Sequence, residues 1–273
     1  MTVLARVLAP ASTANLGPGF DCAGVALDLW NELEVSEGDG DHDPEHLGVR
    51  AFARIAPPQG KRFSFTDRIP TERGLGSSAA VIALGLVAAI VVQGRKVSYE
   101  ELLAEGIELE GHGDNLAAAL AGGVCLTWKT RIARVAEQAP AVPIALIPES
   151  TVSTTAARDV LPAEVAHADA SFTAARATLL GAALASGSEE LFAEALDDRL
   201  HEPYRKANAP LLDAVRDRLP DGALGATLSG SGPTVMVWAR YHAAAACAKE
   251  LSRRYPDVRV LTLQVSPRGA HAL

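Results

Sequence analysis

The stretch PTERGLGSSAAVIALGLVAAI, Pro70 to Ile90, places a Gly-Leu-Gly-Ser-Ser turn directly before a run of small apolar residues. The pattern predicts a buried helix from Ser78 to Val92. The first N–H groups of a helix have no intrahelical partner, and this end carries a partial positive charge. Glycines let the backbone approach an anion closely, and serine hydroxyls can donate to phosphate or ligate a metal. The stretch therefore has the features of a phosphate-binding loop.

Two common phosphate-binding motifs do not fit this stretch. No Gly-Lys-Ser or Gly-Lys-Thr follows the glycines, and the dinucleotide pattern G-x-G-x-x-G fails at Ala79. Taken alone, the stretch is equally compatible with a glycine turn that has a serine N-cap and binds nothing. Other segments must decide between these interpretations.

The composition excludes several classes of protein. The chain has 273 residues, 48% of them hydrophobic, which is enough for one large domain or two small ones. The net charge is −8 and no block of Lys or Arg occurs, so we expect neither nucleic acid nor a membrane as partner. The longest apolar run, Ala79 to Val92, is too short to cross a bilayer.

The cysteines and the first residues indicate a cytoplasmic protein. Cys22, Cys125 and Cys247 are far apart and form no C-x-x-C pair, as expected of reduced thiols. The opening MTVLARVLAP has no basic segment followed by a long apolar one, so we expect no signal peptide.

Hydrophobic periodicity predicts two mixed α+β halves that meet near residues 140–150. Pro10 is expected to end the first strand, and residues 11–21 are expected to form a loop. Ser98 and Glu101 form a capping box for a helix that runs toward Glu110. The predicted strands span residues 3–10, 24–35, 61–66, 124–128, 142–148, 223–230, 234–239 and 258–265. Helices are predicted over residues 44–56, 78–92, 98–110, 116–123 and 241–254, with further helical segments between 155 and 219.

Two other segments resemble the glycine-serine stretch in composition. APASTANLGPGFD places Asn15 and Asp21 on a glycine-containing loop, and TLSGSGPT lies between two predicted strands. Each of these segments alone fits a structural turn, in which Asn and Asp are common.

Together, and in this order, the three segments resemble the GHMP kinases. PTERGLGSSAA is similar to the nucleotide-phosphate motif of that family, and LSGSGPT to its C-terminal glycine motif. Other segments resemble the homoserine kinase branch: PASTANLGPGFDCAGVALDLWNELEV, EGHGDNLAAALAGG, VSTTAARDVLP and HEPYRKANAP. The resemblance covers essentially the whole chain. Gly113 stands where a proline is usual, and Ser231 where many members have alanine; both residues are compatible with a turn.

The resemblance implies a fold and a reaction. The fold is α+β with two domains: a nucleotide-binding domain over residues 1–145, like the second domain of ribosomal protein S5, and a ferredoxin-like domain over residues 146–273. The reaction is phosphorylation of L-homoserine by ATP with Mg²⁺, in threonine biosynthesis in the cytoplasm, and a homodimer is compatible with it. The alternatives are another small-molecule kinase of this fold and a relative that binds ligands without catalysis.

The resemblance also assigns residues to ATP and to the substrate. The expected ATP-binding residues are Pro70, Thr71, Glu72, Arg73, Gly74, Leu75, Gly76, Ser77, Ser78, Ala79, Ala80, Ser229, Gly230, Ser231 and Gly232. The expected substrate-binding residues are Asn15, Asp21, His112, Arg158 and Arg205. Arg158 and Arg205 would bind the carboxylate of homoserine, since a guanidinium can form two parallel hydrogen bonds with it. Asp21 would accept from its ammonium group.

Catalytic and metal-binding roles fall on a few polar residues. Asp114 matches an aspartate proposed as the base in related kinases, although it also suits a helix N-cap, and Asn115 would orient the hydroxyl. Ser78 is the expected hydroxyl ligand of Mg²⁺, which prefers hard oxygen ligands. Glu110 and Glu108 both qualify as its carboxylate ligand, and Glu110 is preferred.

Overall fold

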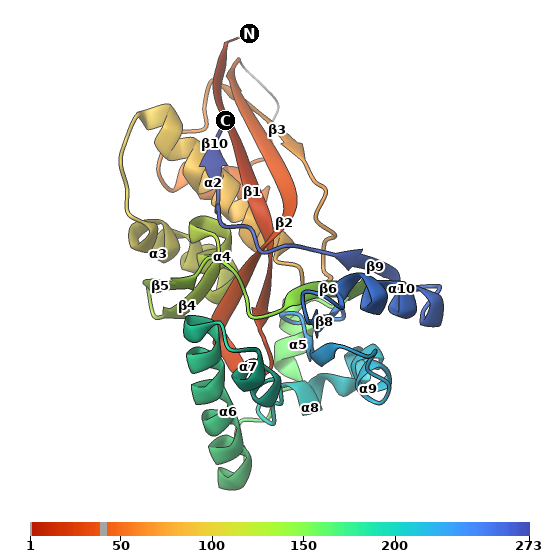
Figure 1. Ribbon diagram of the computed structural model, residues 1–273. Coiled ribbons are helices and arrows are strands. Elements are labelled where there is room, and N and C mark those ends of the chain that lie inside the picture. The colour runs from red at the N-terminus through yellow and green to blue at the C-terminus, as the bar shows by residue number, and fades with distance from the viewer. Residues whose placement is uncertain (1, 39–42) are drawn as a thin grey trace.

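The computed structural model describes residues 2–38 and 43–273 and contains two antiparallel sheets with helices packed on them (Figure 1). In these ranges, no helix has both the length and the apolar character needed to cross a membrane.

The first sheet is built around two long strands, which pair along most of their length. Its order is β10-β1-β2-β4-β5, and β3 also pairs with β2. The strands are β1 (Val3–Asn15), β2 (Gly19–Glu37), β3 (Lys61–Thr66), β4 (Val124–Trp128), β5 (Arg131–Ala136) and β10 (His271–Ala272). The helices of this half are α1 (Leu47–Ala53), α2 (Ser77–Gln93), α3 (Tyr99–Glu110) and α4 (Asp114–Ala121).

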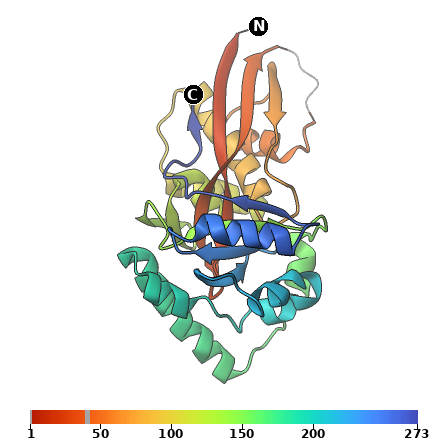
Figure 2. The same cartoon turned by 45° about the vertical axis from the view of Figure 1, so that its right-hand side comes forward.

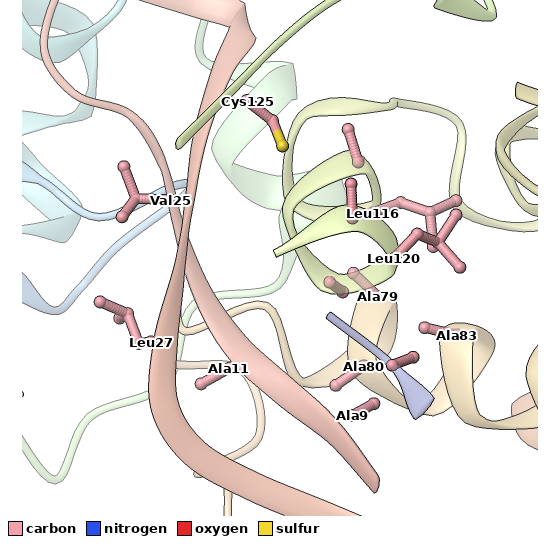
Figure 3. Packing of buried hydrophobic residues seen from close by; sticks show 14 of the residues in the cluster. Ala9, Ala11, Val25, Leu27, Ala79, Ala80, Ala83, Leu116, Leu120 and Cys125 are labelled. Atoms are coloured by element: carbon pink, nitrogen blue, oxygen red, sulfur yellow. The ribbon is translucent and has the colours of Figure 1, made fainter. Parts of the chain in front are cut away.

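Helix α2 is the central helix of the first half because it is apolar on every side. Residues 79–89 are all buried, and α2 packs on β1, α1 and α4. Small side chains allow this close packing: Ala79, Ala80 and Ala83 of α2 lie near Leu116 and Leu120 of α4 (Figure 3). The helix predicted over residues 78–92 is therefore confirmed.

The second sheet has the order β7-β8-β6-β9, which is the strand order of a ferredoxin-like βαββαβ unit. Helix α10 lies over its strands (Figure 2). The strands are β6 (Val142–Ile147), β7 (Ala223–Leu228), β8 (Val235–Ala239) and β9 (Arg259–Thr262). The helical segments are α5 (Thr154–Asp159), α6 (His167–Ser186), α7 (Glu189–Ala195), α8 (Glu202–Arg205), the 3₁₀ turn η1 (Lys206–Asn208), α9 (Leu211–Arg216) and α10 (Ala244–Arg254).

The prediction that Pro10 ends the first strand is wrong. Strand β1 continues to Asn15, and only residues 16–18 form a turn before β2. Pro10 is tolerated because it lies at a register shift opposite Trp30 of β2, and β10 pairs with β1 only at Val7 and Leu8. A missing N–H is acceptable at such an irregularity.

Other boundaries also differ from the predicted ones. The last helix begins at Ala244 rather than Tyr241, and strands β5 and β10 were not predicted. Both strands are short or only partly buried, so their hydrophobic pattern is weak.

The two sheets are joined by a shared core and by the end of the chain. One cluster of buried residues contains Val25 of β2 together with Phe192 of α7 and Trp238 of β8. After β9 the chain returns to the first sheet, where Ser266 N donates to Ala26 O at 2.9 Å. The predicted boundary between residues 145 and 146 falls inside β6, and this division stays a prediction.

Candidate active site

Three segments that are distant in the sequence, the end of β1 and two loops, meet at the junction of the two halves. Ser12 N donates to Leu75 O at 3.1 Å, which joins β1 to the loop before α2. The hydroxyl of Ser229 donates to Gly74 O at 2.7 Å and lies 2.8 Å from the hydroxyl of Thr13. The three segments that resemble one another in composition therefore form one structure.

These segments enclose a cavity of about 430 Å³. Its lining includes all the predicted substrate-binding, catalytic and metal-binding residues: Asn15, Asp21, Ser78, Glu110, His112, Asp114, Asn115, Arg158 and Arg205. The predicted ATP-binding residues that line it are Thr71, Glu72, Arg73, Gly74, Gly76, Ser77, Ser78, Gly230 and Ser231. Lining residues that were not predicted are Phe20, His46, Leu47, Asp67, Val81, Val152, Ser153 and Thr154.

The remaining predicted ATP-binding residues do not line the cavity. Leu75, Ala79 and Ala80 belong to the hydrophobic core, and Ser229 is buried under Gly74. Pro70 and Gly232 are likewise absent from the lining.

The first turn of α2 points unpaired N–H groups at this cavity. Its N-cap, Gly76, has a φ of 64°, and no side chain of the described residues caps the helix. Ser77 and Ser78, the first two helical residues, line the cavity. This end of α2 can accept an anion such as a phosphate group.

Arg73 lines the cavity and also holds the loop in place. Its guanidinium donates to three backbone carbonyls: Thr71 O at 3.1 Å, Pro148 O at 3.2 Å and Glu149 O at 2.8 Å. The side chain thus ties the loop before α2 to the segment after β6.

Ser78 and Glu110 form the pair of oxygen ligands expected for a divalent cation. The Ser78 hydroxyl donates to Glu110 Oε1 at 2.6 Å. Burial raises the pKa of Glu110, and the hydrogen bond from Ser78 opposes this. Glu108 is exposed and does not line the cavity, which favours Glu110 as the ligand.

Asp21 and Arg158 are paired with each other. Arg158 Nη2 donates to Asp21 Oδ1 at 2.6 Å and Nη1 donates to Oδ2 at 3.1 Å. Asp21 has a φ of 56°, and its N–H donates to Asn15 Oδ1 at 3.1 Å, so the β1–β2 turn fixes its position. Arg158 therefore has a partner already, which its predicted role did not include.

Arg205 differs from Arg158 because it is 2% exposed, and among the described residues it has no carboxylate at ion-pair distance. Its guanidinium donates to Ala157 O at 3.1 Å, Gly230 O at 3.2 Å and His201 Nδ1 at 3.0 Å. Burial, followed by the nearby charge of Arg158, lowers its pKa. The charges of Asp21, Asp114 and Asp198 oppose this shift from beyond ion-pair distance.

Asp114, Asn115 and His112 form a connected group at the start of α4. Asp114 is the first helical residue, and its Oδ1 lies 2.8 Å from His112 Nδ1 and accepts from Asn115 N at 2.7 Å. Burial lowers the pKa of His112, but the hydrogen bond and charge of Asp114, with Glu110, outweigh it and raise the pKa overall. Ser12 donates to Asn115 Oδ1 at 2.9 Å, so the amide N–H groups of Asn115 are left for other partners.

Comparison of the sequence with known proteins identifies one family. Residues 46–123 match the N-terminal domain of the GHMP kinases, and residues 180–257 match their C-terminal domain. The homoserine kinase of Synechococcus sp. is 41% identical over an alignment 257 residues long, which covers 85% of this chain and 84% of that protein. The chain belongs to the GHMP kinases. Within them it belongs to the homoserine kinases.

Further relatives extend the match over the full chain. The homoserine kinase of Prochlorococcus marinus is 36% identical over an alignment 298 positions long, gaps included, which covers 98% of this chain and 91% of that protein. The crystal structure of homoserine kinase from Cytophaga hutchinsonii aligns with a TM-score of 0.87 at 27% identity, covering 98% and 97% of the two chains. The predicted family and its two-domain α+β fold are confirmed.

Phe20, which is half-buried, and His201, which is fully buried, lie against the site and were missed from the sequence. The Phe20 ring lies 5.8 Å from the guanidinium carbon of Arg158 and 5.3 Å from that of Arg205. His201 precedes Arg205 by four residues, one helical turn, and this spacing in HEPYR was the available signal.

Proposed function

We propose that this chain transfers the γ-phosphoryl group of ATP to the hydroxyl of L-homoserine and releases O-phospho-L-homoserine and ADP. One observation carries the proposal: a single cavity joins the N-terminus of α2 to Asp21, Arg158 and Arg205. An anion-binding helix end next to charges of both signs suits a kinase whose substrate is a zwitterion. The family of relatives that bear the name homoserine kinase supports the same reaction.

At the phosphate end of the cavity, ATP is bound mainly by backbone N–H groups. Phosphoryl transfer needs positioning and neutralisation of charge more than covalent chemistry. The unpaired N–H groups of Ser77 and its neighbours donate to phosphate oxygens, and Gly230 and Ser231 line the opposite wall. The buried residues Leu75, Ala79, Ala80 and Ser229 hold this part of the backbone in place.

The donor set at the start of α2 fits Mg²⁺. Ser78 Oγ and Glu110 Oε1 are hard oxygen atoms 2.6 Å apart. Mg²⁺ is usually held by one or two protein oxygens, with phosphates and water supplying the rest. Among the described residues no three His, Cys, Asp or Glu side chains gather as a metal site, which agrees with a cation that arrives with the nucleotide. When bound, Mg²⁺ would neutralise phosphate charge.

At the substrate end, the unpaired cation Arg205 binds the carboxylate of homoserine, and Asp21 accepts from its ammonium group. Arg158 keeps its hydrogen bonds to Asp21 and adds positive charge beside the carboxylate. Both arginines thereby discriminate in favour of amino-acid substrates.

Asn115 and Asp114 bind and deprotonate the hydroxyl group of the substrate. Asn115 donates an amide N–H to the hydroxyl oxygen, because Ser12 already occupies its Oδ1. Asp114 accepts the hydroxyl proton, and His112 stabilises the carboxylate that precedes this transfer. We further propose that the enzyme works in the cytoplasm, in threonine biosynthesis.

Product identification tests the proposed function. Purified protein is incubated with L-homoserine, ATP and Mg²⁺, and ³¹P NMR follows the phosphorus signals. We expect one new phosphomonoester signal and equimolar ADP. ADP released without the phosphomonoester, or no ATP consumption, would contradict the proposal; binding without turnover would indicate a non-catalytic relative.

A further inference from the structure

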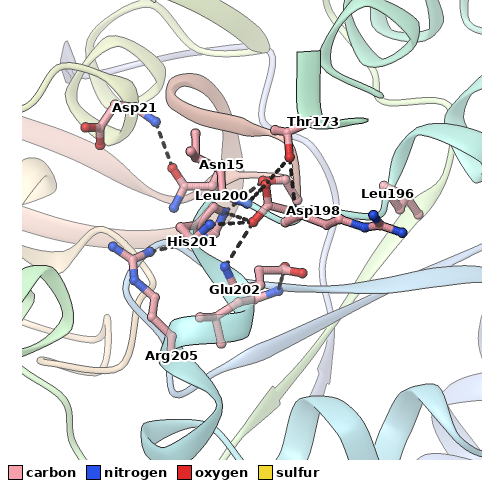
Figure 4. A network of polar contacts seen from close by, with 12 residues as sticks. Asn15, Asp21, Thr173, Leu196, Asp198, Leu200, His201, Glu202 and Arg205 are labelled. Carbon is pink, nitrogen blue, oxygen red and sulfur yellow. Dashed lines mark hydrogen bonds and ion pairs between the residues drawn. The ribbon is translucent and has the colours of Figure 1, made fainter. Parts of the chain in front are cut away.

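His201 lies immediately behind Arg205, outside the lining of the cavity. It is the N-cap residue of α8, is 0% exposed, and stands one helical turn before Arg205 (Figure 4). The Phe20 ring stacks on its imidazole with the ring centroids 4.9 Å apart. The histidine therefore contacts the site only through other residues.

The hydrogen bonds of His201 determine which ring nitrogen carries the proton. Nε2 lies 2.8 Å from Gly17 O, and a carbonyl oxygen can only accept, so Nε2 carries hydrogen. Nδ1 lies 3.0 Å from Arg205 Nη1, and a guanidinium can only donate, so Nδ1 is bare. This arrangement requires the neutral Nε2–H tautomer, because a proton on Nδ1 would face the N–H of Arg205.

The charged groups around the ring are consistent with a neutral histidine. Burial lowers the pKa of His201 to about 4; Asp198 and Asp21 oppose this shift and Arg205 adds to it. Asp198 Oδ2 lies 3.7 Å from Nε2, but it accepts from the backbone N–H groups of His201 and Glu202, at 2.7 and 2.9 Å. The carboxylate thus fixes the backbone at the start of α8.

Among the residues that the structure describes, three groups accept hydrogen bonds from Arg205, and the imidazole of His201 is the one that belongs to a side chain. The other two anchors are backbone carbonyls, Ala157 O from α5 and Gly230 O from the loop after β7. Three anchors from three directions fix the plane of the guanidinium. They leave its remaining N–H groups free for an anion in the cavity.

We propose that His201 is a positioning residue: as a neutral acceptor it sets the direction in which Arg205 meets the substrate carboxylate. The inference rests on the proposed function, because that function makes Arg205 the carboxylate ligand. The anchors use Nε and both hydrogens of Nη1, so Nη2 is the group left for the carboxylate. A guanidinium that rotates freely would lose this orientation while keeping its charge.

Two matched variants distinguish the contribution of the acceptor Nδ1 from that of the donor Nε2–H. In His201→Asn, the side-chain oxygen lies near the position of Nδ1 and can still accept from Arg205. In His201→Gln, the amide nitrogen lies near the position of Nε2 and can donate to Gly17 O, but the acceptor for Arg205 is lost. We expect His201→Gln to lower kcat/KM for homoserine about ten- to a hundredfold, mostly through KM. On a logarithmic scale, the loss in kcat/KM in His201→Asn should be at most about half of the loss in His201→Gln. In both variants, KM for ATP should stay within about twofold of the wild-type value.

A third comparison tests whether His201 acts through Arg205. Adding His201→Gln to Arg205→Leu should cost nothing further in kcat/KM for homoserine, because the group that it positions is gone. Equal losses in His201→Asn and His201→Gln, with KM for ATP raised as much as KM for homoserine, would reduce His201 to a structural role and overturn the inference.

NMR of the wild-type imidazoles provides a test that needs no turnover. Two-bond ¹H–¹⁵N spectra should show one histidine in the Nε2–H form that does not titrate between about pH 5 and 8, and its Nδ1 signal should shift in Arg205→Leu. An Nδ1–H form, or a pKa near 6.5 for His201, would overturn the inference even if homoserine is phosphorylated. The two tests can fail independently. If this protein gives the expected NMR result but does not phosphorylate homoserine, the proposed function is overturned, whereas the role of His201 as an anchor of Arg205 is supported.

Discussion

At the scale of single residues, the two arginines of the site are in different electrostatic states. Arg158 is half-exposed and forms two hydrogen bonds with Asp21. Arg205 is buried and holds only neutral acceptors. A buried charge that has no direct ion-pair partner costs about several kcal/mol, and a bound carboxylate would offset part of that cost. Arg205 is therefore the stronger candidate for the determinant of substrate affinity.

The pH dependence of stability should report the buried imidazole of His201. Its pKa is about 4 in the folded protein, below the ordinary histidine value of 6.5 that applies to the unfolded chain. Between these values the unfolded chain binds more protons than the folded one, so stability falls as the pH falls. The loss amounts to about 2 kcal/mol in the free energy of unfolding between pH 7.5 and pH 5.

Urea unfolding of wild type and His201→Asn at both pH values measures this contribution. Glu202 acts in the opposite sense, because burial raises its pKa to about 7 and the folded state gains protons first as the pH falls. Glu202 is present in both proteins, so the difference between them isolates His201. The advantage of wild type over the variant should shrink at pH 5; an unchanged difference would contradict the buried neutral state.

The proposed metal site gives a second prediction at this scale. Glu110→Gln should raise the Mg²⁺ concentration for half-maximal activity about tenfold and lower kcat, because an amide oxygen binds a hard cation more weakly. Glu108→Gln is the matched control on the same helix and should behave like wild type. A Mg²⁺ titration of activity at saturating ATP compares the two, and the reverse pattern would assign the ligand to Glu108.

At the scale of elements, the glycines before α2 serve the contact between loops. A Cβ at Gly74 would lie 2.1 Å from Ser229 O, and one at Gly76 would lie 2.1 Å from Ser12 Oγ. The sequence suggested that these glycines allow close approach of a phosphate. The structure shows that they allow close approach of the other two segments, which shape the cavity.

Gly74→Ala should therefore lower stability as well as ATP affinity. A methyl group at φ of 73° against a carbonyl at 2.1 Å forces the two loops apart. We expect a loss of about 2–4 kcal/mol in the free energy of unfolding. The control is Gly94→Ala, which has φ of 60° but no atom within 4 Å and should cost about 1 kcal/mol. Urea unfolding decides; equal costs would show that Gly74 is not needed for loop packing.

Local features were predictable from the sequence, whereas distant pairings were not. The capping box of α3 formed as predicted, because Ser98 and Glu101 are close in the chain. The apolar run of α2 likewise identified a buried helix. The Asp21–Arg158 pair joins residues 137 positions apart, and no periodicity in a single sequence indicates such a contact. The resemblance placed both residues in the site without showing that they bind each other.

At the scale of the whole molecule, the two sheets depend on each other. Buried side chains of α7 and β8 belong to the same core as those of β1 and β2. The chain end adds a second link, in which Ala270 N donates to Ala119 O at 2.7 Å and β10 pairs with β1. The site lies at this junction, so its geometry depends on both halves.

The shared core predicts a single cooperative unfolding transition. Calorimetry should give one peak, with the calorimetric enthalpy equal to the van't Hoff enthalpy. Gly269→Ala should lower the midpoint without splitting the peak, because a Cβ there would lie 2.1 Å from Leu120 O. Two separate transitions in the wild type would contradict the shared core.

The central claim is that this cavity phosphorylates an amino acid because Arg205 binds its carboxylate and Asp21 its ammonium. The most direct measurement is kcat/KM for L-homoserine and for mevalonate, with Mg²⁺ and ATP, in wild type, Arg205→Leu, Arg205→Lys and Asp21→Asn. Wild type should strongly prefer homoserine, and Arg205→Leu should lose about tenfold to more than a hundredfold with KM for ATP nearly unchanged. Arg205→Lys should recover only part, because a lysine ammonium is a point charge that cannot also keep the contacts with Ala157 O, Gly230 O and His201 Nδ1. Asp21→Asn should also lower the homoserine value. Equal use of mevalonate by wild type, or full homoserine activity in Arg205→Leu, would contradict the account.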